Sequence, residues 1–151
     1  MKIKSGLLAL CALGFFAPVQ AEHHNAEDII VGSWICDYSV MGFKDKAYIN
    51  YRDDKTMDGK FAYSYPGLHG KGAFNLNLQV SGTWFIVNKT LTESYQPNKT
   101  ELSVSTGFTV DNSANFAGKG PQTNKATIIR LTDKQLQLKE TDGEITHCKR
   151  Q

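Results

Sequence analysis

Phe74-Asn75-Leu76-Asn77-Leu78-Gln79-Val80 is the stretch that decides the fold, because apolar and amide side chains alternate along it without a break. Successive side chains of a β-strand point to opposite faces of a sheet, so this alternation predicts a strand with one buried and one solvated face. The rest of the chain also favours strands. Aromatic residues and Thr are frequent, and straight-chain helix formers never line up at helical spacing.

The same period of two, read together with turn signals, predicts nine strands: 33–40, 47–52, 60–65, 73–80, 83–87, 90–95, 125–131, 135–141 and 144–149. Four short links carry residues that tolerate the positive φ of tight hairpins: Asp58-Gly59, Asn88-Lys89, Asp133-Lys134 and Asp142-Gly143. Regular strands joined by hairpins predict an all-β fold, an antiparallel up-and-down barrel or a sandwich.

The N-terminal segment has the features of a cleavable secretory signal. Lys2 and Lys4 precede an apolar run over residues 7–19, and Val19-Gln20-Ala21 offers compact residues at the cleavage site. We therefore expect a signal peptide at 1–21, a tail at 22–30 and one barrel domain at 31–151, located in the periplasm or secreted. Cys11 leaves a lipoprotein alternative open, although Leu10 is not the small residue that lipoprotein cleavage prefers.

The processed chain carries no net charge, because the formal +2 of the full sequence comes from Lys2 and Lys4. A nucleic-acid partner would need a clustered basic surface, and Lys44, Lys46 and Lys55 are interspersed with aspartates. We therefore expect no nucleic-acid partner. No apolar run reaches the roughly 20 residues of a membrane-spanning helix, so we also expect no transmembrane segment.

Two cysteines remain after cleavage, Cys36 and Cys148, one near each end of the processed chain. Exported proteins form and keep disulfides, so we expect these two to pair, with two buried free thiols as the alternative. In an antiparallel pair, a residue two before one partner lies opposite a residue two after the other. The bond would therefore set Trp34 against Arg150, with the guanidinium on the indole face.

Three motifs give the chain a family resemblance: Gly32-Ser33-Trp34-Ile35-Cys36, Gly82-Thr83-Trp84 and Thr146-His147-Cys148-Lys149-Arg150. With Gly-x-Trp opening the first strand and a basic residue on the last, the chain resembles small secreted bacterial lipocalin-like proteins. The resemblance implies a β-barrel closed by one disulfide and a role in ligand binding. The chain departs from typical lipocalins around the second and third hairpins, so a barrel filled by side chains is the alternative to an open cavity.

The segment 97–124 interrupts the regular strands, because it is rich in glycine and has only scattered apolar residues. A loop of this length in a compact domain is usually functional or disordered. We expect an irregular strand at 102–110 and a flap at 111–124.

Catalysis has little support in the sequence, which lacks a serine elbow, an HExxH pair and a phosphate-binding glycine loop. His69 lies at an expected hairpin tip and His147 alternates with Cys148, and neither has an acid arranged beside it. We expect no enzyme activity, catalytic residue or cofactor. Cleavage after Ala21 would leave Glu22-His23-His24 at the N-terminus, whose nitrogen donors suit Cu(II) or Ni(II), with a disordered polar tail as the alternative.

The sequence thus predicts a non-catalytic binding protein for a small hydrophobic ligand. Its ligand-binding candidates are Trp34, Tyr38, Tyr63, Phe74, Leu76, Leu78, Trp84 and Arg150. For the two tryptophans, packing in the core is the favoured role, with ligand contact as the alternative. The alternative function is an envelope protein-interaction module, of an inhibitor or immunity type, with a solid barrel and binding loops at 65–71 and 107–125.

Overall fold

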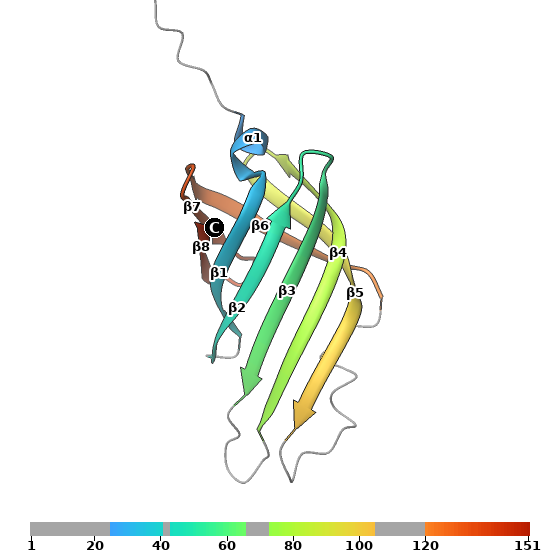
Figure 1. Ribbon diagram of the computed structural model, residues 1–151. Helices are drawn as coiled ribbons and strands as arrows, with labels where there is room; N and C mark the ends of the chain where they lie inside the picture. The colour runs from blue at the N-terminus through green and yellow to red at the C-terminus, as the bar shows by residue number, and fades with distance from the viewer. Residues whose placement is uncertain (1–24, 41–42, 66–72, 105–119) are drawn as a thin grey trace, which may run out of the picture.

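The computed structural model describes residues 25–40, 43–65, 73–104 and 120–151. They form one short helix and eight strands: α1 (Ala26–Ile30), β1 (Gly32–Val40), β2 (Phe43–Tyr51), β3 (Thr56–Tyr65), β4 (Phe74–Val87), β5 (Thr90–Val104), β6 (Gln122–Leu131), β7 (Gln135–Lys139) and β8 (Ile145–Arg150). Each strand pairs antiparallel with the next, and β8 pairs with β1, which closes the barrel (Figure 1). The predicted all-β, antiparallel up-and-down barrel is confirmed.

The disulfide closes the barrel as expected. Cys36 and Cys148 are bonded and lie directly opposite each other in the β1–β8 ladder. In the same register Trp34 faces Arg150, and the guanidinium carbon lies 4.3 Å from the centroid of the indole ring. The predicted pairing of the chain's two ends is therefore confirmed.

The alternation at residues 74–80 has the predicted consequence, since Phe74, Leu76, Leu78 and Val80 are buried. However, 83–87 is not a separate strand, because β4 continues through Ser81-Gly82 to Val87. Gly82 lies so close to β5 that an added Cβ would sit 2.1 Å from the Ser94 carbonyl oxygen. This glycine permits a close approach of two strands and does not form a turn.

The predicted turns hold at three of the four sites. Asn88 and Lys89 both have positive φ between β4 and β5, and Gly143 has a φ of 92° between β7 and β8. Asp133 and Lys134 lie between β6 and β7. The prediction for Asp58-Gly59 is wrong, because both residues lie inside β3.

The β2–β3 turn falls instead just before β3, at Lys55, whose φ is 67°. The Asp54 carboxylate stabilises this turn by accepting hydrogen bonds from the backbone N–H and the hydroxyl of Thr56, at 2.9 and 2.6 Å. Since Asp54 can cap the turn in this way, the hairpin does not need the Asp-Gly pair.

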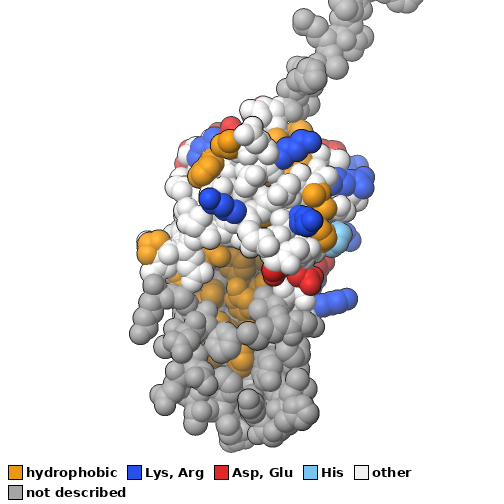
Figure 2. Space-filling view, turned by 180° about the vertical axis from the view of Figure 1, so that it is seen from behind, with side chains coloured by type: hydrophobic (Ala, Val, Ile, Leu, Met, Phe, Trp, Pro, Cys, Tyr) orange, Lys and Arg blue, Asp and Glu red, His pale blue; other side chains and the backbone are white. Residues whose placement is uncertain are grey.

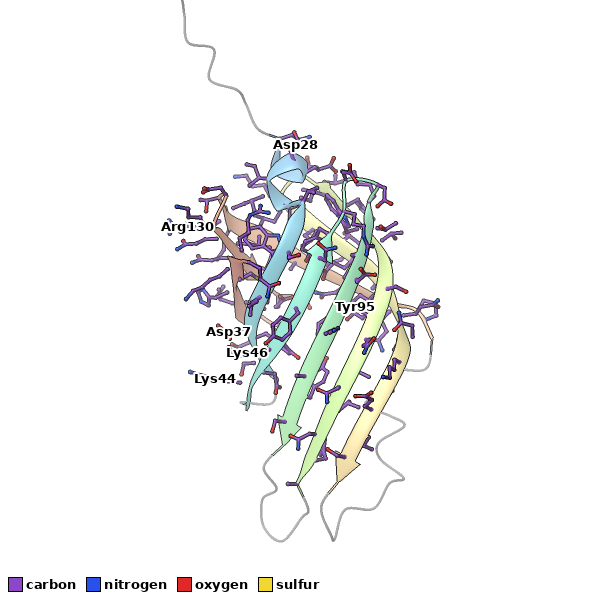
Figure 3. All side chains as sticks on the ribbon, viewed as in Figure 1. Asp28, Asp37, Lys44, Lys46, Tyr95 and Arg130 are labelled. Atoms are coloured by element: carbon purple, nitrogen blue, oxygen red, sulfur yellow. A yellow bond between two sulfur atoms is a disulfide. The ribbon has the colours of Figure 1, made fainter. Side chains whose placement is uncertain are left out.

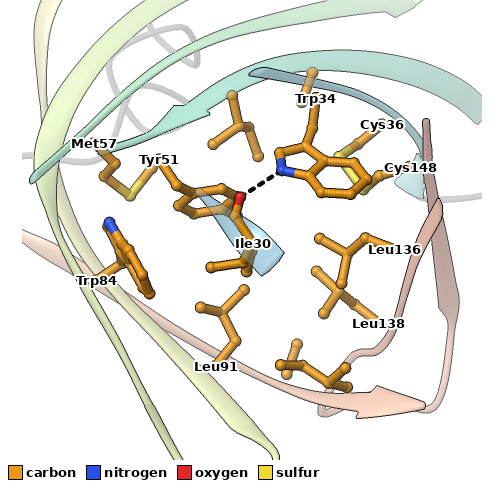
Figure 4. Close-up of a cluster of buried hydrophobic side chains, with 14 residues drawn as sticks. Ile30, Trp34, Cys36, Tyr51, Met57, Trp84, Leu91, Leu136, Leu138 and Cys148 are labelled. Atoms are coloured by element: carbon orange, nitrogen blue, oxygen red, sulfur yellow. Dashed lines mark hydrogen bonds between the residues drawn. A yellow bond between two sulfur atoms is a disulfide. The ribbon is translucent and has the colours of Figure 1, made fainter. Parts of the chain in front are cut away.

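Helix α1 covers one end of the barrel, inside the range 22–30 that the sequence analysis treated as a tail. Ile30 is fully buried, and its carbonyl accepts a 2.7 Å hydrogen bond from the indole N–H of Trp34 (Figure 4). A 2.8 Å ion pair between Glu27 and Lys55 joins the helix to the β2–β3 turn. Around Trp34 and Ile30 lies the main core, which also contains Tyr51, Met57, Trp84, Leu91, Leu136 and Leu138.

The outer face of the barrel carries charged and polar side chains together with exposed hydrophobic ones such as Phe85, Val87 and Ile129. Asp37 and Lys46, which lie opposite each other on β1 and β2, form an ion pair of 3.1 Å (Figure 3). In the described part of the chain, no helix has the length and apolar character needed to cross a membrane. The signal segment, Glu22-His23-His24 and His69 lie outside the described residues. The expected flap at 111–124 is described only from residue 120, and its last residues, 122–124, belong to β6.

Candidate functional site

A cavity of about 250 Å³ opens on the inner face of the barrel, next to the main core. Its lining includes aromatic side chains from β1, β3 and β5 and carboxylates from β5 and the β7–β8 link. Seen from the side of β6, β7 and β8, the molecule has a hollow lined by hydrophobic side chains, with acidic side chains near its edge (Figure 2). This cavity is the candidate functional site.

Four aromatic rings, from Tyr38, Phe61, Tyr63 and Tyr95, form one wall of the cavity, which we call the aromatic wall. Phe61 stacks on Tyr63 and on Tyr95, with ring centroids 6.4 and 5.9 Å apart. Tyr38 meets Phe61 and Tyr63 edge to face, at 6.3 and 5.9 Å. The strand register explains the cluster, because inward positions recur every second residue along β1, β3 and β5.

The hydroxyl of Tyr38 is buried on this wall and has no hydrogen-bond partner in the described part of the chain. Burial is the main reason why its pKa is raised, and the nearby Tyr63 raises it further. Burial likewise raises the pKa of Tyr95 to about 12, with the charge of Glu93 as the second cause. At neutral pH these phenols are therefore uncharged and present both apolar rings and hydroxyl groups to the cavity.

Glu93 lies at the inner end of the cavity and is only 5% exposed. One carboxylate oxygen accepts a 2.5 Å hydrogen bond from the Tyr51 hydroxyl, and the other accepts a 3.3 Å hydrogen bond from the Asn124 amide. The same amide nitrogen donates to Glu140 at 3.4 Å, and Glu140 also accepts a 2.8 Å bond from the Thr146 hydroxyl. Two carboxylates therefore share one donor inside the barrel, and we call this group the carboxylate pair.

Burial raises the pKa of Glu93 above its ordinary value, and the negative charge of Glu140 acts in the same direction. The hydrogen bonds from Tyr51 and Asn124 oppose this effect because they stabilise the ionised form. Burial also raises the pKa of Tyr51, so this residue remains a hydrogen-bond donor. The site thus holds a carboxylate whose ionised form is costly in the empty cavity.

The eight predicted ligand-binding residues separate into three groups. Tyr38 and Tyr63 lie on the cavity wall. Trp34 and Trp84 belong to the main core. Arg150 covers Trp34 at the end of the barrel that α1 covers, which we call the closed end. The other three belong to a second buried cluster on β4, next to Phe61, Tyr63 and Tyr95: Phe74, Leu76 and Leu78.

The sequence analysis missed the polar residues of the cavity, above all Glu93. In Leu91-Thr92-Glu93-Ser94-Tyr95, the period of two places Glu93 on the same face as Leu91 and Tyr95. A carboxylate at an inward position of a strand is the signal that could have identified it. Glu140 and Asn124 gave no such signal, because only the closed barrel brings them next to Glu93.

The strand pairing gives the chain a closed antiparallel barrel of eight strands with an interior cavity, the up-and-down architecture that lipocalins also have. No protein-family model and no curated protein matches the chain. The chain is similar to a lipocalin-like protein from Bacteroides uniformis ATCC 8492, with a TM-score of 0.49, 11% identity and coverage of 82% of this chain and 99% of that chain. The closed barrel itself is established by the strand pairing.

Proposed function

We propose that this chain is an exported, non-catalytic binding protein that holds a small, largely apolar ligand in the barrel cavity. The observation that carries the proposal is the cavity, which joins an aromatic wall to a few polar groups at one end. Most small-molecule sites combine apolar walls with a few polar groups that fix the orientation of the ligand. The Cys36–Cys148 bond supports export, because disulfides persist in oxidising compartments.

The size of the cavity restricts the ligand. Its volume of about 250 Å³ lies just below the roughly 300 to 1,000 Å³ of pockets that enclose drug-sized ligands. We therefore expect a ligand smaller than a drug-sized molecule, with at most two or three rings or a chain of similar size. The alternative function, protein interaction through a solid barrel, gains no support from the described residues: of its expected binding loops, 66–71 and 107–119 lie outside them, and 122–125 belong to β6.

Titration with N-phenyl-1-naphthylamine, an apolar dye that is uncharged at neutral pH, tests the proposal through its fluorescence. We expect a saturable increase with one dye bound per chain. Ala47→Leu places an isobutyl group in the cavity and should weaken binding about tenfold or more. The matched control is Ala62→Leu, because Ala62 lies on the exposed face of the neighbouring strand and its replacement should leave binding unchanged.

Circular dichroism must show that both variants keep the β-barrel spectrum of the wild type. Absence of saturable binding by the wild-type protein, to this dye and to a panel of small apolar compounds, would overturn the proposal. Equal binding of the dye by both leucine variants would show that the dye binds outside the cavity.

A further inference from the structure

The carboxylate pair is unusual because its negative charge has no basic partner among the residues that the structure describes. In the described residues, the ion pairs join Asp37 to Lys46, Arg52 to Asp58, Lys55 to Glu27 and Lys99 to Glu101. None of them involves Glu93 or Glu140. A buried carboxylate ordinarily has a cationic partner, because loss of hydration otherwise makes its ionised form costly.

A second, independent observation concerns hydrogen bonding at the aromatic wall. The Tyr38 hydroxyl is buried against the cavity and makes no hydrogen bond within the described residues. The Tyr63 hydroxyl interacts with it, and because a phenol can both donate and accept, the Tyr38 hydroxyl keeps hydrogen-bonding capacity for a group in the cavity. The aromatic wall also presents ring faces, which attract cations through their negative quadrupole.

On the basis of the proposed function, we infer that the cavity binds a small organic amine in its protonated form. Its ammonium group donates hydrogen bonds to the carboxylates of Glu93 and Glu140, and its apolar part packs against Phe61, Tyr63 and Tyr95. The ligand supplies a positive charge that none of the described residues places beside the carboxylate pair. The amide of Asn124 lies between the two carboxylates and holds them at one end of the cavity.

The described groups around Glu93 are neutral or acidic, so they are compatible with a bound ammonium group. Tyr51 on β2 and Tyr95 on β5 are neutral phenols at physiological pH, because burial raises the pKa of both. Glu140 adds a second negative charge, and Asp45 contributes another near Tyr38. Since the charged groups among the described residues that line the cavity are acidic, a bound cation meets attraction from them.

The test compares two probes of the same shape, 2-phenylethylamine and 2-phenylethanol, by isothermal titration calorimetry at neutral pH. We expect the amine to bind about ten- to a hundredfold more tightly than the alcohol, as a charge-assisted hydrogen bond provides. Glu93→Gln should remove this preference and leave alcohol binding unchanged. Glu101→Gln is the matched control, because Glu101 lies on the exposed face of the same strand and should keep the preference.

The amine should also lose affinity as the pH falls, because its partner must be ionised. Equal affinity of the wild type for amine and alcohol would overturn the inference, as would an amine preference that survives Glu93→Gln. If Glu93→Gln does not fold, the pH dependence of amine binding by the wild-type protein is the deciding measurement. An amine affinity that stays constant between pH 7 and pH 4 overturns the inference. Binding of N-phenyl-1-naphthylamine in the same protein separates the two proposals, since the cavity proposal fails only if this dye does not bind either.

Discussion

The bond between Cys36 and Cys148 joins residues separated by 112 positions, so its removal is the strongest single perturbation of the barrel. In the chain-entropy treatment, a bridge across a loop of this length stabilises the folded state by about 4.8 kcal/mol at 25 °C. A domain of this size has a total stability of about 5 to 15 kcal/mol. Reduction should therefore leave a folded barrel that has lost a large share of its free energy of unfolding.

Urea unfolding followed by tryptophan fluorescence measures this loss, because Trp34 and Trp84 are both buried at the closed end of the barrel. The oxidised and reduced wild-type proteins differ only in the bond, since reduction leaves both sulfur atoms in the buried positions. We expect the free energy of unfolding to fall by about 4 to 5 kcal/mol. The double variant Cys36→Ala/Cys148→Ala is the control, and reductant should not change its unfolding curve.

Two results would refute this reasoning. A loss of less than about 1 kcal/mol on reduction would mean that the bridge hardly restricts the unfolded chain. Two free thiols in protein isolated without reductant would show that the ends of the chain are not bonded at all.

Three further predictions concern single residues. Arg150→Lys keeps the positive charge but loses the guanidinium group, which donates hydrogen bonds to the carbonyls of Ile29, Val31 and Asp133. The free energy of unfolding should therefore fall by about 1 to 3 kcal/mol. The control Lys149→Ala, on the exposed face, should lower it by less than about 0.5 kcal/mol. Gly82→Ala places a Cβ against the Ser94 carbonyl and the Tyr95 backbone and should cost about 1 to 3 kcal/mol in urea unfolding, more than Gly59→Ala, whose Cβ meets only side chains. Because the pKa of Glu93 is raised in the folded state, the wild type should lose stability as the pH rises from 4.5 through that pKa, by at most about 1.4 kcal/mol per pH unit. Glu93→Gln should flatten this dependence, and a stability gap between variant and wild type that grows toward low pH would contradict the assignment.

Local patterns were enough to predict most of the barrel. The alternation at residues 74–80 identified the inner face of β4, and the Asn88-Lys89 pair identified the turn that follows it. These features depend only on neighbouring residues, because the period of two and the positive φ of a tight turn are local properties. The cysteine pairing was also predictable, since only two cysteines remain after the expected cleavage.

The errors came from features that depend on tertiary contacts. The sequence Ala26–Ile30 is too short to form a stable helix alone, and α1 exists because Ile30 enters the core and Asn25 caps its first turn. Ser81-Gly82 has the composition of a turn, but the closeness of β4 to β5 requires glycine there for space. The carboxylate pair was likewise out of reach, because Glu93 and Glu140 meet only when the barrel closes.

The two Gly-x-Trp motifs explain why the cavity lies away from the tryptophans. Trp84 repeats the arrangement of Trp34: its indole N–H donates to backbone carbonyls of Arg52 and Thr56, and the Lys55 ammonium lies 4.3 Å from its ring centroid. Both rings therefore have their N–H groups satisfied by backbone and a ring face covered by a cation.

An indole used in this way has no free surface for a ligand, and the cations that cover it remain at the closed end of the barrel. Lys55 is further held there by its ion pair with Glu27 of α1. The cavity is left with carboxylates and phenols but no basic side chain among the described residues that line it. Among the described residues inside the barrel, cations lie over the two indoles and carboxylates line the cavity, and the proposed preference for a cationic ligand rests on this separation of charge.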